Sequence, residues 1–115
     1  MKKPISEAIR KDLGREEFVT WFIEIALIEH ECEHAIKNIN KWAKALPVDT
    51  AMLVGPAMSR ITYEPLGVIC IMGSWNFPLY STLGPLINVI AAGNTAVIKP
   101  SELAPYTVIA LRNLI

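Results

Sequence analysis

Residues 63–102, YEPLGVICIMGSWNFPLYSTLGPLINVIAAGNTAVIKPSE, decide the fold of this chain. The run at 67–72 is short, continuously apolar and rich in β-branched residues, which predicts a strand buried on both faces. Residues 73–77 then turn the chain, and Pro78 suits the first position of a helix, where its missing N–H costs nothing. We therefore expect an apolar helix over 79–92.

A second strand and helix follow directly. Gly93 is a natural left-handed cap for the first helix, and Thr-Ala-Val-Ile at 95–98 predicts another buried strand. Ser101 is expected to cap a further helix that continues to about Leu114. Strand, crossover helix, strand and helix form a right-handed βαβα unit, which implies parallel strands.

The strongest helical periodicity lies at residues 16–45. Apolar side chains recur at helical spacing in one stripe, made of Phe18, Trp21, Ile25, Ile28, Cys32, Ala35, Ile39 and Trp42 and widened by Phe22, Ile36 and Ala43. This pattern predicts an amphipathic helix. We expect burial of Trp21, Phe22, Ile25, Ile39 and Trp42, and outward positions for Glu24, Glu31, Lys37, Asn38 and Lys41. Gly14 separates it from a shorter helix around 6–13, and Pro47 ends it.

The patterns together predict an α/β chain in three parts. N-terminal amphipathic helices (1–46) and a surface connector with a short extended segment (47–60) precede the parallel βαβα unit (61–115). The net charge is zero without a dense basic cluster, which argues against a nucleic-acid partner. The hydrophobic share of 52% is at or above the top of the soluble range. It indicates apolar faces that the rest of a larger protein covers.

Membrane and metal functions are less favoured. Residues 67–98 carry no charge, which is long enough for a transmembrane helix, but prolines, glycines and asparagines interrupt the stretch repeatedly. Cys32 and Cys70 are expected to be small buried hydrophobes. His30 and His34 would share one helical face, but a second pair of ligands is missing, so we expect no metal site.

Two loops are expected at the carboxyl edge of the sheet, where open α/β proteins bind ligands. The loops are 73–77 and 99–102, and neither is a GxGxxG loop, so these residues indicate only a nucleotide-sized crevice. Asn76 offers N–H donors that could stabilise an oxyanion, worth about 3–4 kcal/mol, or it could be a helix N-cap. Lys99 and Glu102 could hold both hydroxyls of a ribose, or Glu102 could simply favour a helix N-terminus.

The sequence resembles the nucleotide-binding start of an aldehyde dehydrogenase. The matching motifs are Trp-Asn-Phe-Pro at 75–78 and AAGNTAVIKPSE at 91–102. Glu-Pro-Leu-Gly-Val at 64–68 and Ala-Ile-Arg-Lys-Asp-Leu at 8–13 are similar to the fatty-aldehyde, class 3-like branch. Ser74, where the family often has proline, also fits that branch.

This resemblance implies roles for individual residues. Asn76 would help to form the oxyanion hole. The Lys-Pro-Ser-Glu motif would hold the adenosine ribose of the cofactor, and further residues would line the cofactor cleft. The implied cofactor-binding residues are Met72, Ser74, Trp75, Lys99, Ser101 and Glu102.

The resemblance also implies an overall activity, the oxidation of an aldehyde to a carboxylic acid with NAD or NADP. Residues 61–115 would be the first half of a Rossmann-like NAD(P)-binding domain in a cytoplasmic homodimer. The thiolate nucleophile and glutamate base would lie beyond Ile115, so the 115-residue chain alone is expected to be inactive. Two other functions stay open: a non-catalytic nucleotide-binding module, and a membrane-associated structural fragment. The aldehyde chain length and any C-terminal membrane anchor are not fixed by this sequence.

Overall fold

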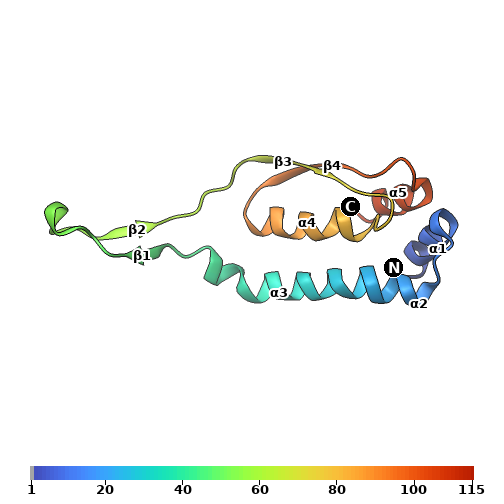
Figure 1. The fold of residues 1–115 in the computed structure, drawn as a ribbon, viewed down its shortest axis with the longest axis horizontal. Coiled ribbons are helices and arrows are strands. Elements are labelled where there is room, and N and C mark those ends of the chain that lie inside the picture. Colours follow the sequence, from blue (N-terminus) through green and yellow to red (C-terminus); the bar gives the residue numbers. More distant parts are fainter. Residues whose placement is uncertain (1) are drawn as a thin grey trace.

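The structure, a computed structural model, describes residues 2–115. The molecule is elongated, with principal extents of 64 × 24 × 20 Å. Its body has three layers: the helix α3 (Ala26–Trp42), the helix α4 (Tyr80–Ala91), and the strands β3 (Val68–Met72) and β4 (Thr95–Lys99). As Figure 1 shows, α3 runs along one side of α4 and the strand pair lies on the other side.

The topology of the βαβα unit is the one that the sequence predicts. β3 and β4 pair in parallel, in a register that runs from Val68 opposite Thr95 to Met72 opposite Lys99. α4 makes the crossover between them, and Gly93 after its end has the expected left-handed conformation, with φ of +78°. The α/β fold class and the parallel strands are therefore confirmed.

The prediction that both strands are buried on both faces is wrong. In β3, only Ile71 is fully buried and Ile69 is half-buried, while Val68, Cys70 and Met72 between them are exposed. β4 shows the same alternation, since its side chains are exposed at every second position. Successive side chains of a strand point to opposite faces, and α4 covers only one of them. Cys70 is thus not the buried hydrophobe that the sequence suggests.

Two helical segments begin the chain. The helix α1 (Lys2–Leu13) ends just before Gly14, whose φ of +66° produces the expected break. The predicted long helix follows as the consecutive segments α2 (Glu17–Thr20), η1 (Trp21–Ile25) and α3. η1 is a π-helical turn.

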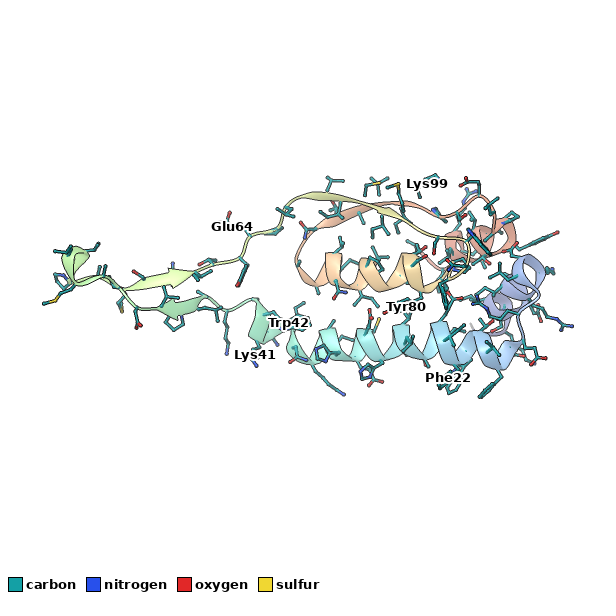
Figure 2. The ribbon with its side chains drawn as sticks, in the orientation of Figure 1. Phe22, Lys41, Trp42, Glu64, Tyr80 and Lys99 are labelled. Atoms are coloured by element: carbon teal, nitrogen blue, oxygen red, sulfur yellow. The ribbon has the colours of Figure 1, made fainter. Side chains whose placement is uncertain are left out.

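The π turn changes which side chains face the body. Among the side chains expected to be buried, Ile25 is buried but Trp21, Phe22, Ile39 and Trp42 are exposed. Figure 2 shows Phe22 on the side of the helix that points away from α4. Glu24, expected to point outward, is 0% exposed, and Glu31, also expected to point outward, is half-buried against α4. A π turn contains more residues than an α turn, so one stripe cannot continue through it, and Glu24 and Ile25 both turn inward.

Residues 47–60, expected to form a surface connector, form most of a hairpin. β1 (Leu46–Val48) pairs antiparallel with β2 (Ser59–Ile61), and the short 3₁₀ turn η2 (Met52–Val54) lies between them. The sequence suggests that Pro47 ends the long helix. Instead, α3 ends at Trp42 and Pro47 lies inside β1. The hairpin projects from one end of the body (Figure 1).

The helix α5 (Pro105–Arg112) starts later than expected. Ser101 does not cap it, because the Ser101 hydroxyl accepts the N–H of Leu103 at 3.3 Å within the preceding turn. Instead α5 packs against α1, and the buried core joins α1, η1, the start of α4 and α5. The fully buried members of this core are Ile5, Ile9, Ile25, Leu79 and Leu111.

Asp12 of α1 provides the cap that α5 lacks. The N-cap position of α5 is Ala104, whose side chain has no acceptor. The carboxylate of Asp12 accepts the N–H of Tyr106 at 3.1 Å, and the N–H and hydroxyl of Thr107 at 2.7 and 2.6 Å. The Lys11 ammonium lies 5.3 Å from the centroid of the Tyr106 ring. These contacts fasten the first helix to the last one.

The uncharged stretch 67–98 forms β3, the following turn, α4 and most of β4. Among the helices of residues 2–115, none reaches the combination of length and hydropathy that spanning a bilayer requires.

Candidate active site

The turn between β3 and α4 is held tightly at both ends. The N–H of Gly73 donates to the carbonyl of Lys99 at 2.9 Å, which extends the parallel ladder by one bond. A Cβ on Gly73 would overlap the hydroxyl oxygen of Thr82, so this position requires glycine. The N–H of Ser74 donates to the hydroxyl of Ser81 at 2.9 Å. The turn therefore leaves the sheet along a fixed path.

Asn76 lies in this turn with an exposed side chain. It does not cap α4, because the helix begins at Tyr80 and its N-cap residue is Leu79. Within residues 2–115, the side-chain amide of Asn76 has no hydrogen-bond partner, while its backbone carbonyl accepts a bond from Arg15. Both N–H groups of the amide are thus available to a ligand.

An open pocket of about 600 Å³ adjoins this turn. Asn76 and Ser74 lie on its wall, and the pocket is bounded by the turn, α4 and one residue of α3. The other lining residues are Glu31, Phe77, Tyr80, Ser81, Gly84, Pro85 and Asn88. Figure 2 shows Tyr80 between α4 and α3. The amide of Asn76 therefore borders a space that could hold a small molecule.

Tyr80 and Glu31 form the polar contact between α4 and α3 in this pocket. The Tyr80 hydroxyl donates to a carboxylate oxygen of Glu31 at 2.6 Å. This hydrogen bond raises the pKa of Tyr80 above its ordinary value of 10.0, and burial and the negative charge of Glu31 act in the same direction. Tyr80 is therefore neutral across the physiological pH range.

Lys99 and Glu102 meet at the same edge of the sheet. Lys99 is the last residue of β4 (labelled in Figure 2), and its ammonium lies 2.7 Å from a carboxylate oxygen of Glu102. Glu102 belongs to the turn before α5 and not, as expected, to the first turn of a helix. Their side chains are 61% and 77% exposed. The hydrogen bond from Lys99 lowers the pKa of Glu102 below 4.5, so it is a carboxylate at neutral pH.

The other proposed cofactor residues differ in their exposure to solvent. Met72 is exposed and lies opposite Lys99 in the strand register, so the two loops meet there. Trp75 and Ser74 are exposed in the turn that follows β3. Ser101, in contrast, is buried. Across residues 2–115, no three His, Cys, Asp or Glu side chains gather as a metal site would require.

The sequence reasoning missed the partner of the α4 N-terminus. One oxygen of the Glu24 carboxylate accepts the N–H groups of Leu79 and Tyr80, both at 2.8 Å. A signal for this was present, because Glu24 is the lone charged residue between Phe18 and Ile28. A carboxylate in such an apolar run is rarely buried without partners.

Arg15 was also missed. One guanidinium nitrogen of Arg15 donates to the second oxygen of Glu24, and the other donates to the backbone carbonyl of Asn76. The guanidinium also lies over the ring of Phe77, 5.3 Å from its centroid. Arg15 thus links the buried carboxylate to the turn that carries the exposed amide.

Comparison with known proteins identifies relatives. The model of the aldehyde dehydrogenase family matches residues 2–115. An aldehyde dehydrogenase of Craterostigma plantagineum is 39% identical over 113 residues, which cover 98% of this chain and 24% of the relative. Further relatives in Mus musculus and Pongo abelii are named members of aldehyde dehydrogenase family 3. The chain spans about a quarter of the length of these curated relatives.

Solved structures agree with this relationship. Staphylococcus aureus AldH in a substrate-bound state has a TM-score of 0.95 and 38% identity, covering 98% of this chain and 25% of that one. Succinic semialdehyde dehydrogenase of Streptococcus pyogenes, in complex with NADP⁺, has a TM-score of 0.83 over 96% of this chain and 23% of its own. At 20% identity, the second likeness concerns the fold alone. The resemblance to the aldehyde dehydrogenases is thus confirmed.

Proposed function

The chain belongs to the aldehyde dehydrogenase family, and we propose that it takes part in the oxidation of an aldehyde to a carboxylic acid with NAD or NADP. The observation that carries this proposal is the state of Asn76. Its amide is exposed beside an open pocket, without a hydrogen-bond partner in residues 2–115. Its backbone carbonyl accepts a hydrogen bond from Arg15. A side-chain amide without a hydrogen-bond partner, on a residue whose backbone is fixed, suits ligand binding better than a structural role.

The chemistry that this amide can perform is oxyanion stabilisation. When a nucleophile adds to an aldehyde, negative charge develops on the former carbonyl oxygen. A fixed N–H donor aimed at that oxygen lowers the barrier by about 3–4 kcal/mol. In this proposal Asn76 binds the oxygen and the adjoining pocket holds the rest of the aldehyde. The nucleophile and the general base come from the remainder of the full-length protein.

The Lys99–Glu102 pair has the donor set for a ribose. The Lys99 ammonium can donate to one hydroxyl, and the Glu102 carboxylate, kept ionised by its lowered pKa, can accept from another. A bound nicotinamide dinucleotide would supply the acceptor for the hydride of the substrate. Met72, Ser74 and Trp75 would border the cleft. A carboxylate repels a 2′-phosphate, so we propose a moderate preference for NAD, because Lys99 offsets part of that repulsion.

The domain division at 1–46, 47–60 and 61–115, the homodimer and the cytoplasmic location stay proposals. A rat relative is named as dimeric and NADP-preferring. The word dimeric supports a dimer, and the NADP preference of that relative runs against the NAD preference proposed here from Glu102. An Arabidopsis thaliana relative is named as chloroplastic, so membership of the family does not by itself support a cytoplasmic location.

The experiment that tests the proposed function uses the purified full-length protein. Aldehydes of increasing chain length are offered with NAD or NADP, reduced cofactor is followed by absorbance, and the product is identified by mass spectrometry. We expect aldehyde-dependent reduction of the cofactor, with one carboxylic acid formed per reduced cofactor. Dinucleotide binding without turnover of any aldehyde would instead identify a non-catalytic nucleotide-binding module.

A further inference from the structure

Glu24 is the most deeply buried charged group near the candidate active site. Its side chain is 0% exposed, and its partners are Arg15 and the N–H groups of Leu79 and Tyr80. A buried carboxylate is tolerated only when it is paired and hydrogen-bonded. The N-terminus of α4, for its part, has no capping side chain of its own. Glu24 therefore satisfies a helix start that lies 55 residues away in the sequence.

Arg15 extends this contact to the preceding turn. Its side chain is 16% exposed. One guanidinium nitrogen donates to Glu24 and the other donates to the carbonyl oxygen of Asn76. The planar fork of a guanidinium fixes two acceptors relative to each other. The ring of Phe77, under the guanidinium, limits its movement further. The backbone is thereby held at Asn76, and Glu24 holds it again at Leu79 and Tyr80.

We propose that Arg15 and Glu24 are positioning residues for the Asn76 amide. This inference rests on the proposed function, in which that amide binds the oxyanion. The carbonyl of Asn76 belongs to the same residue as the amide, so holding it restricts the backbone rotation that would swing the side chain. A catalytic group must be held within about 0.5 Å of its working position, and a displacement of about 1 Å can lower a rate about a hundredfold.

A purely structural ion pair is the alternative. In that case, breaking the pair would destabilise the fold without changing the rate, or it would lower the rate equally with and without Asn76. The two cases separate in a double-mutant cycle, because residues that act through one another show non-additive effects.

The test compares Arg15→Lys, Asn76→Ala and the double variant in the full-length enzyme. Lysine keeps the positive charge beside Glu24 but lacks the planar fork. Arg10→Lys is the matched control, because Arg10 is an exposed arginine of α1. The quantities measured are kcat at saturating aldehyde and cofactor, cofactor Kd, and the midpoint of thermal unfolding.

We expect Arg15→Lys to lower kcat about tenfold when Asn76 is present, and less than about twofold in the Asn76→Ala background. Cofactor Kd should stay unchanged, and Arg10→Lys should leave all three quantities unchanged. Equal losses of kcat in both backgrounds would overturn the proposal. So would a lower unfolding midpoint with kcat retained.

Glu24→Gln repeats the cycle if Arg15→Lys does not fold. Glutamine keeps an oxygen for the N–H groups of Leu79 and Tyr80 but loses the charge that holds Arg15, and the same non-additive pattern is expected. A loss of kcat in Asn76→Ala without any loss in Arg15→Lys or Glu24→Gln would overturn this inference alone. Unchanged kcat in Asn76→Ala would overturn the proposed role of the amide, and this inference with it.

Discussion

Asp12 and Thr107, which lie 95 residues apart in the sequence, are joined by two hydrogen bonds to one carboxylate oxygen. Glu24 makes the corresponding contact with the start of α4. Neither α4 nor α5 has a capping side chain of its own. Both helices of the βαβα unit thus begin on a carboxylate from the N-terminal helices. The N-terminal helices therefore supply the acceptors that satisfy the first N–H groups of both α4 and α5.

Removing the Asp12 carboxylate should destabilise the protein. Thr107 is 0% exposed, so Asp12→Ala leaves its N–H and hydroxyl without their acceptor. We expect a loss of about 1–3 kcal/mol in the free energy of unfolding, measured by urea denaturation of the full-length protein. Glu7→Ala removes an exposed acid from the same helix and should change stability by less than about 0.5 kcal/mol. Equal effects of the two substitutions would show that the α5 cap contributes nothing.

Tyr80 should ionise later than an ordinary tyrosine. Its pKa is raised above 10.0 mainly by the hydrogen bond to Glu31. The pKa in the folded state exceeds that in the unfolded state, so the stabilisation is complete below pH 10 and is lost as pH rises through the folded value. In Glu31→Gln the pKa of Tyr80 should move back toward 10.0. The check is an ultraviolet titration of tyrosinate.

Tyr80→Phe serves as the control, since it should remove the late-titrating group from the wild-type curve. If the curves of wild type and Glu31→Gln coincide, Glu31 does not accept from Tyr80 in solution.

Glu102→Gln should change the affinity for the cofactor and not the affinity for the aldehyde. Loss of the carboxylate removes an acceptor for a ribose hydroxyl and a repulsion toward a 2′-phosphate. The Kd for NAD should rise, and its advantage over NADP should narrow or reverse. Fluorescence titration of the wild-type and variant full-length enzymes with both cofactors measures this. Unchanged affinity for both would leave Glu102 as a partner of Lys99 alone.

The local sequence predicted those parts of the fold that depend on local chemistry. A β-branched apolar run produced β3, and Gly93 ended α4 because few other residues adopt its φ of +78°. The burial of the strands could not be predicted in the same way. Whether a face of β3 is buried depends on which element packs against it, and α4 packs against only one of the two faces.

The predictions that failed concern features that depend on tertiary structure. The position of Glu24 could not be predicted from helical periodicity, because a π turn shifts the faces of the helix. The caps of α4 and α5 come from distant segments, so a search for local capping residues assigned one of them wrongly to Ser101. For Asn76 the sequence left the cap and the oxyanion donor open, and the structure excludes the cap.

The central claim is that the free amide of Asn76 stabilises the oxyanion, and kcat of Asn76→Ala tests it most directly. The measurement uses the full-length enzyme at saturating aldehyde and cofactor, with Asn113→Ala as the matched control at an exposed asparagine. We predict that kcat falls by about two to three orders of magnitude, while cofactor Kd and the thermal midpoint change little. A kcat within about threefold of wild type, or a loss confined to the thermal midpoint, would contradict the claim.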